Sequence, residues 1–115
     1  MASQIFADLY GCNKDKINNM NYVKECAHRA IFKIGAEIVE EVSHQFSPIG
    51  ITYVAVISTS HFSIHTWPEY GYVAVDVFSC VESVTNDIME QLVEDFEAKD
   101  SNVRSLERII EKEIK

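Results

Sequence analysis

The segment that decides the fold is residues 57–80, which read ISTSHFSIHTWPEYGYVAVDVFSC. Side chains alternate along its first half, with Phe62, Ile64 and Thr66 set against His61, Ser63 and His65. This period of two predicts a strand, residues 68–71 (PEYG) predict a turn, and residues 72–78 predict the returning strand. An unpaired buried polar group costs roughly 1–3 kcal/mol, so the polar side chains of this hairpin need partners or a chemical role.

The turn fixes the register of the hairpin. If Trp67 pairs with Tyr72, the numbers of paired residues sum to 139, so Cys80 lies opposite Thr59 and beside Ser60. A thiol at the mouth of a hairpin next to a serine is a candidate proton donor or nucleophile, or else a small hydrophobe at the end of a strand.

His65 stands five residues from Ser60, an odd number. A regular strand therefore places the two side chains on opposite faces, about 16 Å apart along the chain. His65 is then suited to serve Ser60 of a second copy across a two-fold axis. The other interpretation is a core histidine that is hydrogen-bonded to backbone.

The remaining pattern predicts one domain, residues 1–115, of the α+β class. We expect strands at residues 4–10, 37–46 and Ile51–Ile57, helices at residues 22–34 and 83–98, and a polar loop at residues 13–21. Residues 102–110 form a last strand or a short helix, and the pattern favours the strand. The run ITYVAVI predicts a strand buried on both faces. The expected architecture is a two-layer α/β sandwich, one mostly antiparallel sheet with two helices on one face. Its other face would be buried against a second copy, which predicts a dimer.

Composition narrows the classes of function. A net charge of −8 argues against nucleic acid as a partner. The chain has no apolar run of membrane-spanning length and no signal-peptide pattern, and its three cysteines lack CxxC spacing. We expect a cytoplasmic protein with no membrane partner. His61 and His65 would be more than about 12 Å apart on a strand, so we also expect no metal site with Glu69.

The run HTWPEYGY at residues 65–72, with its gap of fifteen residues from His65 to Cys80, resembles a known signature. It is similar to that of the small prokaryotic pyruvoyl-dependent S-adenosylmethionine decarboxylases, and the resemblance is strongest over residues 46–80. It implies an enzyme that converts S-adenosylmethionine to decarboxylated S-adenosylmethionine and CO2, which supplies aminopropyl groups for spermidine biosynthesis. It also implies a homodimer with shared active sites.

The resemblance implies that the chain is a proenzyme that cuts itself between Thr59 and Ser60, into residues 1–59 and 60–115. The Ser60 hydroxyl would attack the Thr59 carbonyl, and Ser60 would end as a pyruvoyl group. The residue matching His65 acts as the base in this processing, and the hydroxyl matching Thr52 helps to hold the oxyanion. The cofactor would therefore be made from the chain itself, with neither a metal nor pyridoxal phosphate.

For turnover, the resemblance implies a Schiff base between the pyruvoyl group and the substrate amine. Cys80 would return a proton to the substrate, Phe46 would stack on adenine, and Glu69 would accept hydrogen bonds from the ribose. The pyruvoyl group and Cys80 would come from one protomer, and the other four residues from its mate.

Three positions depart from the family pattern. Thr59 stands where the family has Glu, Gln4 stands in place of a Gly-x-His stretch, and Val81 replaces a Gly. Two alternatives therefore stay open. One is a pyruvoyl-dependent arginine or ornithine decarboxylase of the same fold, and the other is an uncleaved, non-catalytic partner subunit.

Overall fold

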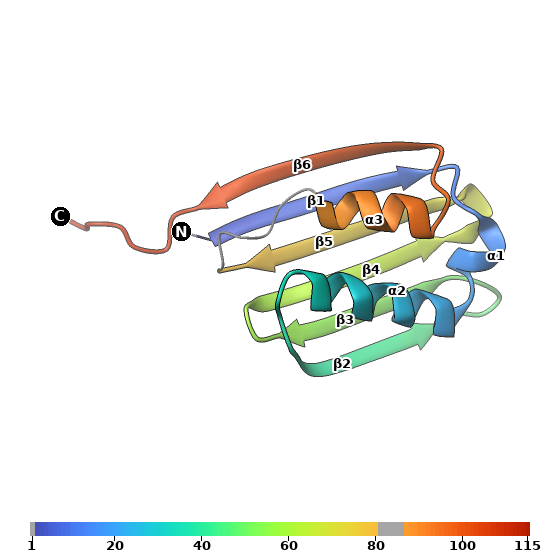
Figure 1. Ribbon diagram of the computed structural model, residues 1–115, viewed down its shortest axis with the longest axis horizontal. Helices are drawn as coiled ribbons and strands as arrows, with labels where there is room; N and C mark the ends of the chain where they lie inside the picture. The colour runs from blue at the N-terminus through green and yellow to red at the C-terminus, as the bar shows by residue number, and fades with distance from the viewer. Residues whose placement is uncertain (1, 81–86) are drawn as a thin grey trace.

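The computed structural model describes residues 2–80 and 87–115, which form one antiparallel sheet with helices on one side (Figure 1). The elements in chain order are β1 (Ala2–Tyr10), α1 (Lys14–Ile17), α2 (Met20–Lys33), β2 (Ile38–Gln45), β3 (Ile51–Ile57), β4 (Ser60–Trp67), the 3-10 helix η1 (Pro68–Tyr70), β5 (Tyr72–Ser79), α3 (Asp87–Asp95) and β6 (Asp100–Arg108). The sheet has six strands in the order β2-β3-β4-β5-β1-β6, and every neighbouring pair is antiparallel. The predicted α+β architecture is confirmed.

The core lies between the sheet and the helices α2 and α3, which lie on the same side of it (Figure 1). Every second side chain of the central strands points into this layer, as the alternating burial of β3, β4 and β5 shows. Fully buried members include Tyr53, Phe62 and Ile64 from the sheet and Val23 and Leu92 from the helices. Burying one such side chain contributes about 1.5–3 kcal/mol, so this layer holds the sheet to its helices.

Within a single chain, strand β3 has one buried face, and the expected burial of its other face is against a second copy. Its side chains are buried on one face only: Ile51, Tyr53, Ala55 and Ile57 are inside, whereas Val56 is 51% exposed. An unbroken apolar run hid this alternation, because valines also occupy the side of the sheet away from the helices. We call that side the open face.

Residues 13–21 were expected to form a polar loop, and this prediction is wrong. They hold α1 and the start of α2. The Asn13 side chain accepts hydrogen bonds from the backbone N–H groups of Asp15 and Lys16, each 3.1 Å long. The Asn19 side chain accepts one from Tyr22, also 3.1 Å long. The asparagines that indicated a loop are therefore helix caps, which satisfy the first N–H groups of each helix. The other two predicted helices correspond to α2 and α3, and residues 83–86 of the second lie outside the described part.

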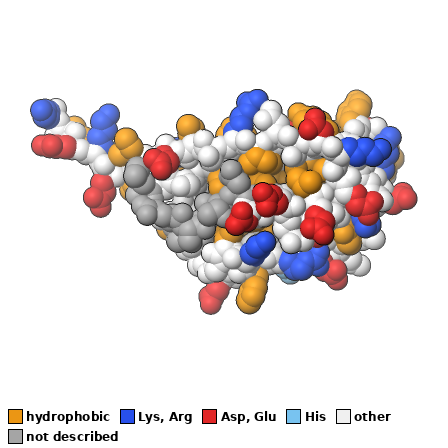
Figure 2. Space-filling view, turned by 45° about the horizontal axis from the view of Figure 1, so that its top comes forward, with side chains coloured by type: hydrophobic (Ala, Val, Ile, Leu, Met, Phe, Trp, Pro, Cys, Tyr) orange, Lys and Arg blue, Asp and Glu red, His pale blue; other side chains and the backbone are white. Residues whose placement is uncertain are grey.

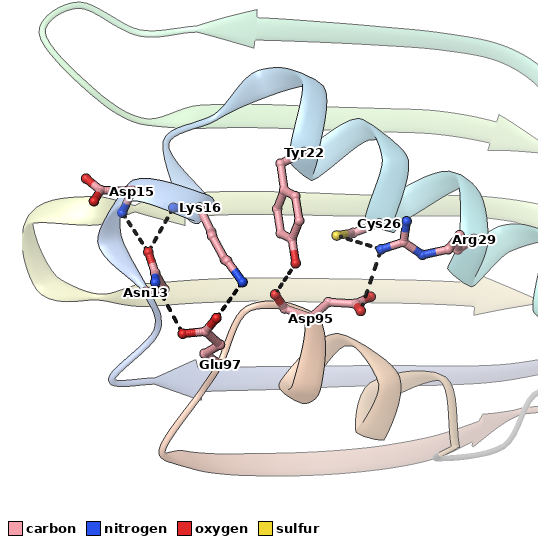
Figure 3. Close-up of polar contacts among 8 residues, drawn as sticks. All are labelled: Asn13, Asp15, Lys16, Tyr22, Cys26, Arg29, Asp95 and Glu97. Carbon is pink, nitrogen blue, oxygen red and sulfur yellow. Dashed lines mark hydrogen bonds and ion pairs between the residues drawn. The ribbon is translucent and has the colours of Figure 1, made fainter.

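A set of polar contacts ties the three helices together on the side away from the open face (Figure 3). The Tyr22 hydroxyl donates to the backbone carbonyl of Asp95 at 2.6 Å, and the Arg29 guanidinium pairs with the Asp95 carboxylate at 3.6 Å. Lys16 pairs with Glu97 just beyond α3. These contacts fix α1 and α2 against α3. Around the helices, acidic and basic side chains are interspersed over the face shown in Figure 2.

Candidate active site

The hairpin of β4 and β5 has the predicted register. Trp67 pairs with Tyr72, and Ser60 pairs with Ser79, so the paired numbers sum to 139 at both ends. The backbone N–H of Cys80 donates to the carbonyl oxygen of Thr59 at 2.9 Å. The ladder therefore continues past the end of the strands and brings Cys80 against the peptide that precedes Ser60.

Two hydrogen bonds to Glu37 hold Ser58, the residue that precedes Thr59 in the turn between β3 and β4. The Ser58 N–H donates to the Glu37 carbonyl at 2.8 Å, and the Glu37 N–H donates to the Ser58 hydroxyl at 2.9 Å. Ser60 itself has a φ of 148°, a region that side chains other than glycine rarely adopt. Such a conformation costs on the order of 1–3 kcal/mol and persists only where surrounding contacts enforce it. The candidate cleavage site is thus a strained residue clamped from both sides.

Cys80 differs from the other two cysteines in its exposure. Cys80 is exposed, whereas Cys12 and Cys26 are buried, and all three are free thiols. Burial raises the pKa of Cys12 to about 11, and it raises that of Cys26 to about 11 as well. Both therefore stay protonated and inaccessible near neutral pH. Only Cys80 combines access to solvent with a place beside Ser60.

Thr52 and His65 form a second cluster at the other end of β4. They are direct partners across β3 and β4, and Thr52 Oγ1 lies 3.1 Å from His65 Nδ1. The alternation along β4 puts His65 on the open face, together with His61 and Ser63. The contact between the Thr52 hydroxyl and Nδ1 fixes the orientation of the imidazole ring. The other ring nitrogen, Nε2, is then held in a set direction and can take up or give a proton there.

This pair lines a pocket of about 300 Å³ that also contains Phe46 and Glu69. Phe46 enters from the end of β2, and Glu69 enters from η1, whose Pro68-Glu69-Tyr70 turn ends at Gly71 with a φ of 62°. The buried hydroxyl of Thr66 accepts a hydrogen bond from the Ile51 N–H at 3.0 Å, which fixes the two strands that form the pocket. An aromatic ring, a carboxylate, a hydroxyl and an imidazole thus share one small cavity.

Sequence reasoning did not single out five further residues that line this pocket, Ile49, Gly50, Ile51, Thr66 and Trp67. Trp67 is 41% exposed although it belongs to the quoted run. The position of Ile49 depends on the loop between β2 and β3, where the Phe46 N–H donates to the Gly50 carbonyl at 2.8 Å. No local pattern in the sequence signals that path.

The seven residues singled out by sequence therefore lie in two separate groups. Thr59, Ser60 and Cys80 form the cleavage-site group, and Phe46, Thr52, His65 and Glu69 form the pocket group. Ser60 and His65 stand at even and odd positions of one strand, about 16 Å apart along it. The expectation that His65 does not reach Ser60 of its own chain agrees with this geometry.

The open face beside the pocket group carries an aromatic and acidic patch. Tyr72 stacks on Tyr10 with ring centroids 5.5 Å apart, and its hydroxyl donates to Asp8 at 2.5 Å. Burial, followed by this hydrogen bond, raises the pKa of Tyr72 to about 12. Trp67 packs on the other side of Tyr72 at 5.3 Å. These rings brace the strand pair that supports His65.

A larger pocket, of about 830 Å³, lies on the helix side and contains none of the seven residues. It is lined by parts of α2, the start of β2 and Gln91 of α3. Its lining is mainly apolar, and we do not assign the site to it. Within residues 2–80 and 87–115, no group of three or more histidine, cysteine or acidic side chains is placed to hold a metal ion. No described helix is long and apolar enough to cross a membrane.

Comparison with known proteins identifies the class first. The fold is similar to the crystal structure of the adenosylmethionine decarboxylase from Aquifex aeolicus VF5, with a TM-score of 0.88 and 33% sequence identity. The match covers 100% of this chain and 97% of that one. The architecture is thus that of an α+β decarboxylase domain.

The sequence comparisons give the family. A family model for S-adenosylmethionine decarboxylase matches residues 3–109. A relative from Moorella thermoacetica is 44% identical over 109 residues, which are 94% of this chain and 87% of the relative. One from Carboxydothermus hydrogenoformans is 43% identical over 94% of this chain and 86% of its own length. Both are described as S-adenosylmethionine decarboxylase proenzymes. This chain belongs to the S-adenosylmethionine decarboxylase family.

Proposed function

We propose that this chain is a self-processing, pyruvoyl-dependent decarboxylase that acts on S-adenosylmethionine, and so feeds spermidine synthesis. One observation carries the proposal beyond family membership. The predicted residues form a cleavage-site group with a strained serine and a pocket group with an aromatic ring, a carboxylate and an imidazole. One group suits chemistry on the backbone, and the other suits recognition of a nucleoside and transfer of a proton.

The cleavage-site group supplies the nucleophile. The Ser60 hydroxyl attacks the Thr59 carbonyl carbon and passes its proton to a base, and the peptide C–N bond then breaks to leave an ester and a free amine. His65 is the base that then takes the Cα proton of Ser60, so that the ester C–O bond breaks and the Thr59 carboxylate leaves; its orientation is set by Thr52 at 3.1 Å. Water converts the dehydroalanine that remains into the pyruvoyl group and releases ammonia. A positioned base of this kind contributes about 10²- to 10⁴-fold to a rate.

The residues fit the pyruvoyl group that this family uses. Ser60 provides its atoms, and its φ of 148° keeps the residue outside ordinary strand geometry at the point where it must be converted. When present, the group supplies a carbonyl that acts as an electron sink during loss of CO2. Cys80 stands beside it as the exposed thiol that holds the proton for the substrate carbon.

The pocket group is suited to the nucleoside part of the substrate. The Phe46 ring is 48% exposed and faces a cavity of about 300 Å³, so a flat base can stack on it. The Glu69 carboxylate can accept hydrogen bonds from two adjacent ribose hydroxyls. Arginine and ornithine have no counterpart to either feature, which favours S-adenosylmethionine.

We further propose that two copies share their active sites in a homodimer. Within one chain the two groups lie at opposite ends of β4, so a complete site needs a second copy. The open face supports such an assembly, because Val42 and Val56 stand 67% and 51% exposed on it. Packing two such faces would bury apolar area, and in the proposed pair the pocket group of one copy serves Ser60 of the other. The three free thiols also agree with a reducing compartment, the cytoplasm.

Denaturing mass spectrometry of the expressed chain tests this function. Two pieces, residues 1–59 and 60–115, are expected, with the second blocked to Edman sequencing. The Ser60→Ala variant is the matched control and stays a single chain. Release of labelled CO2 from carboxyl-labelled S-adenosylmethionine should accompany cleavage. If arginine or ornithine is decarboxylated faster than S-adenosylmethionine, that amino acid is the substrate. If the chain stays intact after long incubation, it is an uncleaved, non-catalytic subunit.

A further inference from the structure

An arginine side chain on the open face has no carboxylate partner. Arg108, the last residue of β6, reaches across β1, and its guanidinium carbon lies over the Phe78 ring, 5.0 Å from the ring centroid. In the part of the chain that the structure describes, no carboxylate forms an ion pair with this guanidinium. The contact with the ring uses the charge of the guanidinium, so its N–H donors remain available for an anion.

The Phe78 ring places this cation at the same end of the sheet as the cleavage-site group. Phe78 lies on the open face, two residues before the exposed Cys80. It pairs with His61, the residue after Ser60, and the two ring centroids are 5.6 Å apart. A guanidinium, two rings and an exposed thiol therefore lie around the start of β4.

The substrate of the proposed reaction brings an anion to this place. An α-amino acid that binds through its amine at residue 60 has its carboxyl carbon about 2.5 Å from that nitrogen. Its carboxylate therefore stays at the cleavage-site end, while the nucleoside extends to the pocket group of the partner copy. The proton from Cys80 goes to the same carbon that loses the carboxylate, so the groups that handle the two must be neighbours. A guanidinium matches a carboxylate with two parallel hydrogen bonds.

We propose that Arg108 binds the α-carboxylate of the substrate, with Phe78 holding its guanidinium in place. This inference rests on the self-processing decarboxylase proposed above, and it adds the residue that recognises the part of the substrate that becomes CO2. The ion pair contributes to affinity and not to the rate of the chemical step, because the carboxylate loses its charge as it becomes CO2. Arg108 therefore selects for an amino acid over the amine that is the product, and so favours product release.

Paired ligands with and without the carboxylate test this role in the fully processed enzyme. Arg108→Gln should raise the KM for S-adenosylmethionine by roughly tenfold or more, with kcat unchanged or higher. The inhibition constant of decarboxylated S-adenosylmethionine, which lacks the carboxylate, should rise less than about threefold. Arg108→Lys keeps the charge and should give an intermediate KM. The matched control is Arg104→Gln, which removes the same group four residues earlier in β6 and should change both constants less than about threefold.

Three results would overturn the inference while leaving the proposed function intact. They are an unchanged KM in Arg108→Gln, an equal loss of affinity for S-adenosylmethionine and its decarboxylated form, and a rise in KM that disappears where native mass spectrometry shows the variant fully dimeric. If arginine or ornithine is the substrate, the effect of Arg108→Gln on KM should persist, because both carry the same carboxylate. An unaltered chain that neither cleaves nor releases CO2 would instead contradict the proposed function, and this inference with it.

Discussion

Thr52 and His65 are direct cross-strand partners, and the hydroxyl oxygen of one lies 3.1 Å from Nδ1 of the other. The pair belongs to adjacent strands of the open face, so its geometry is set by the sheet and not by a loop. This makes the imidazole orientation a property of the β3–β4 register. Any change that removes the hydroxyl should alter what His65 does without unfolding the sheet.

The first prediction follows from this pair. Thr52→Val keeps the shape of the side chain but removes the hydroxyl, so self-cleavage should slow by roughly tenfold or more as the ring of His65 loses its partner. Thr52→Ser keeps the hydroxyl and should cleave within a fewfold of the unaltered rate. The fraction of cleaved chain against time, read by mass spectrometry, measures both. Unchanged cleavage in Thr52→Val would show that the hydroxyl plays no part in processing.

The second prediction concerns which copy supplies His65. A Ser60→Ala chain, which keeps His65, is refolded together with a His65→Ala chain, which keeps Ser60. Cleavage of the His65→Ala chain should be rescued in the mixture, because one site of a mixed dimer combines Ser60 with a partner histidine. Native mass spectrometry confirms that mixed dimers form. If they form and no cleavage follows, His65 does not act across the interface.

The third prediction uses the φ of 148° at Ser60. Ser60→Gly and Ser60→Ala both lack the nucleophile and stay uncleaved, but only glycine adopts this φ without strain. The Gly variant should be more stable than the Ala variant by about 1 kcal/mol, the reverse of the usual order for a strand position. Urea unfolding of the two intact chains measures the difference. Greater stability of the Ala variant would mean that the strained φ is not kept in solution.

The fourth prediction concerns alkaline stability, measured in the Ser60→Ala chain. Burial raises the pKa of Cys12 and of Cys26 from 9.0 to about 11. Between these values the unfolded chain has released both protons while the folded chain retains them, so the free energy of unfolding falls as pH rises from about 9 to 11. Each thiol contributes a loss on the order of 2 kcal/mol. Cys26→Ala should therefore flatten the profile, and urea unfolding of this variant and of its parent between about pH 8 and pH 11 measures the change.

The fifth prediction tests the pocket group in turnover. Glu69→Gln should raise the KM for S-adenosylmethionine with little change in self-cleavage, since the carboxylate is assigned to the ribose and not to processing. A loss of one charged hydrogen bond is worth about 1.5–3 kcal/mol, which is roughly ten- to hundredfold in KM. Steady-state kinetics of the mature enzyme measures it. A cleavage defect of the same size would move Glu69 to the processing machinery.

The hairpin register was predictable because it follows from counting. The turn at residues 68–71 fixed the pairing of Trp67 with Tyr72, and that pairing placed Cys80 opposite Thr59 and separated Ser60 from His65 by parity. Once one pair of an antiparallel hairpin is known, every other pair and the face of every side chain follow from it. The roles assigned to these side chains remain predictions that the variants above test.

The parts that sequence reasoning missed depend on longer-range packing. Asn13 and Asn19 favour loops and helix caps equally, so only the fold decides between them. In β3, burial differs between two faces that carry equally apolar residues, and the sequence does not say which face lacks helices. Ile49 reaches the pocket because of the path of the β2–β3 loop, which no periodicity encodes.

The placement of the two groups at opposite ends of β4 affects how fast a newly made chain matures. If Ser60 of one copy meets His65 only in a second copy, a newly made chain is chemically inert until it encounters another. Maturation then begins as a second-order process, whose half-time lengthens as the chain is diluted below the dissociation constant of the unprocessed pair. The cell would accumulate active enzyme only above a threshold of synthesis, and the pool of unpaired chain would form a reserve that needs no inhibitor to keep it silent.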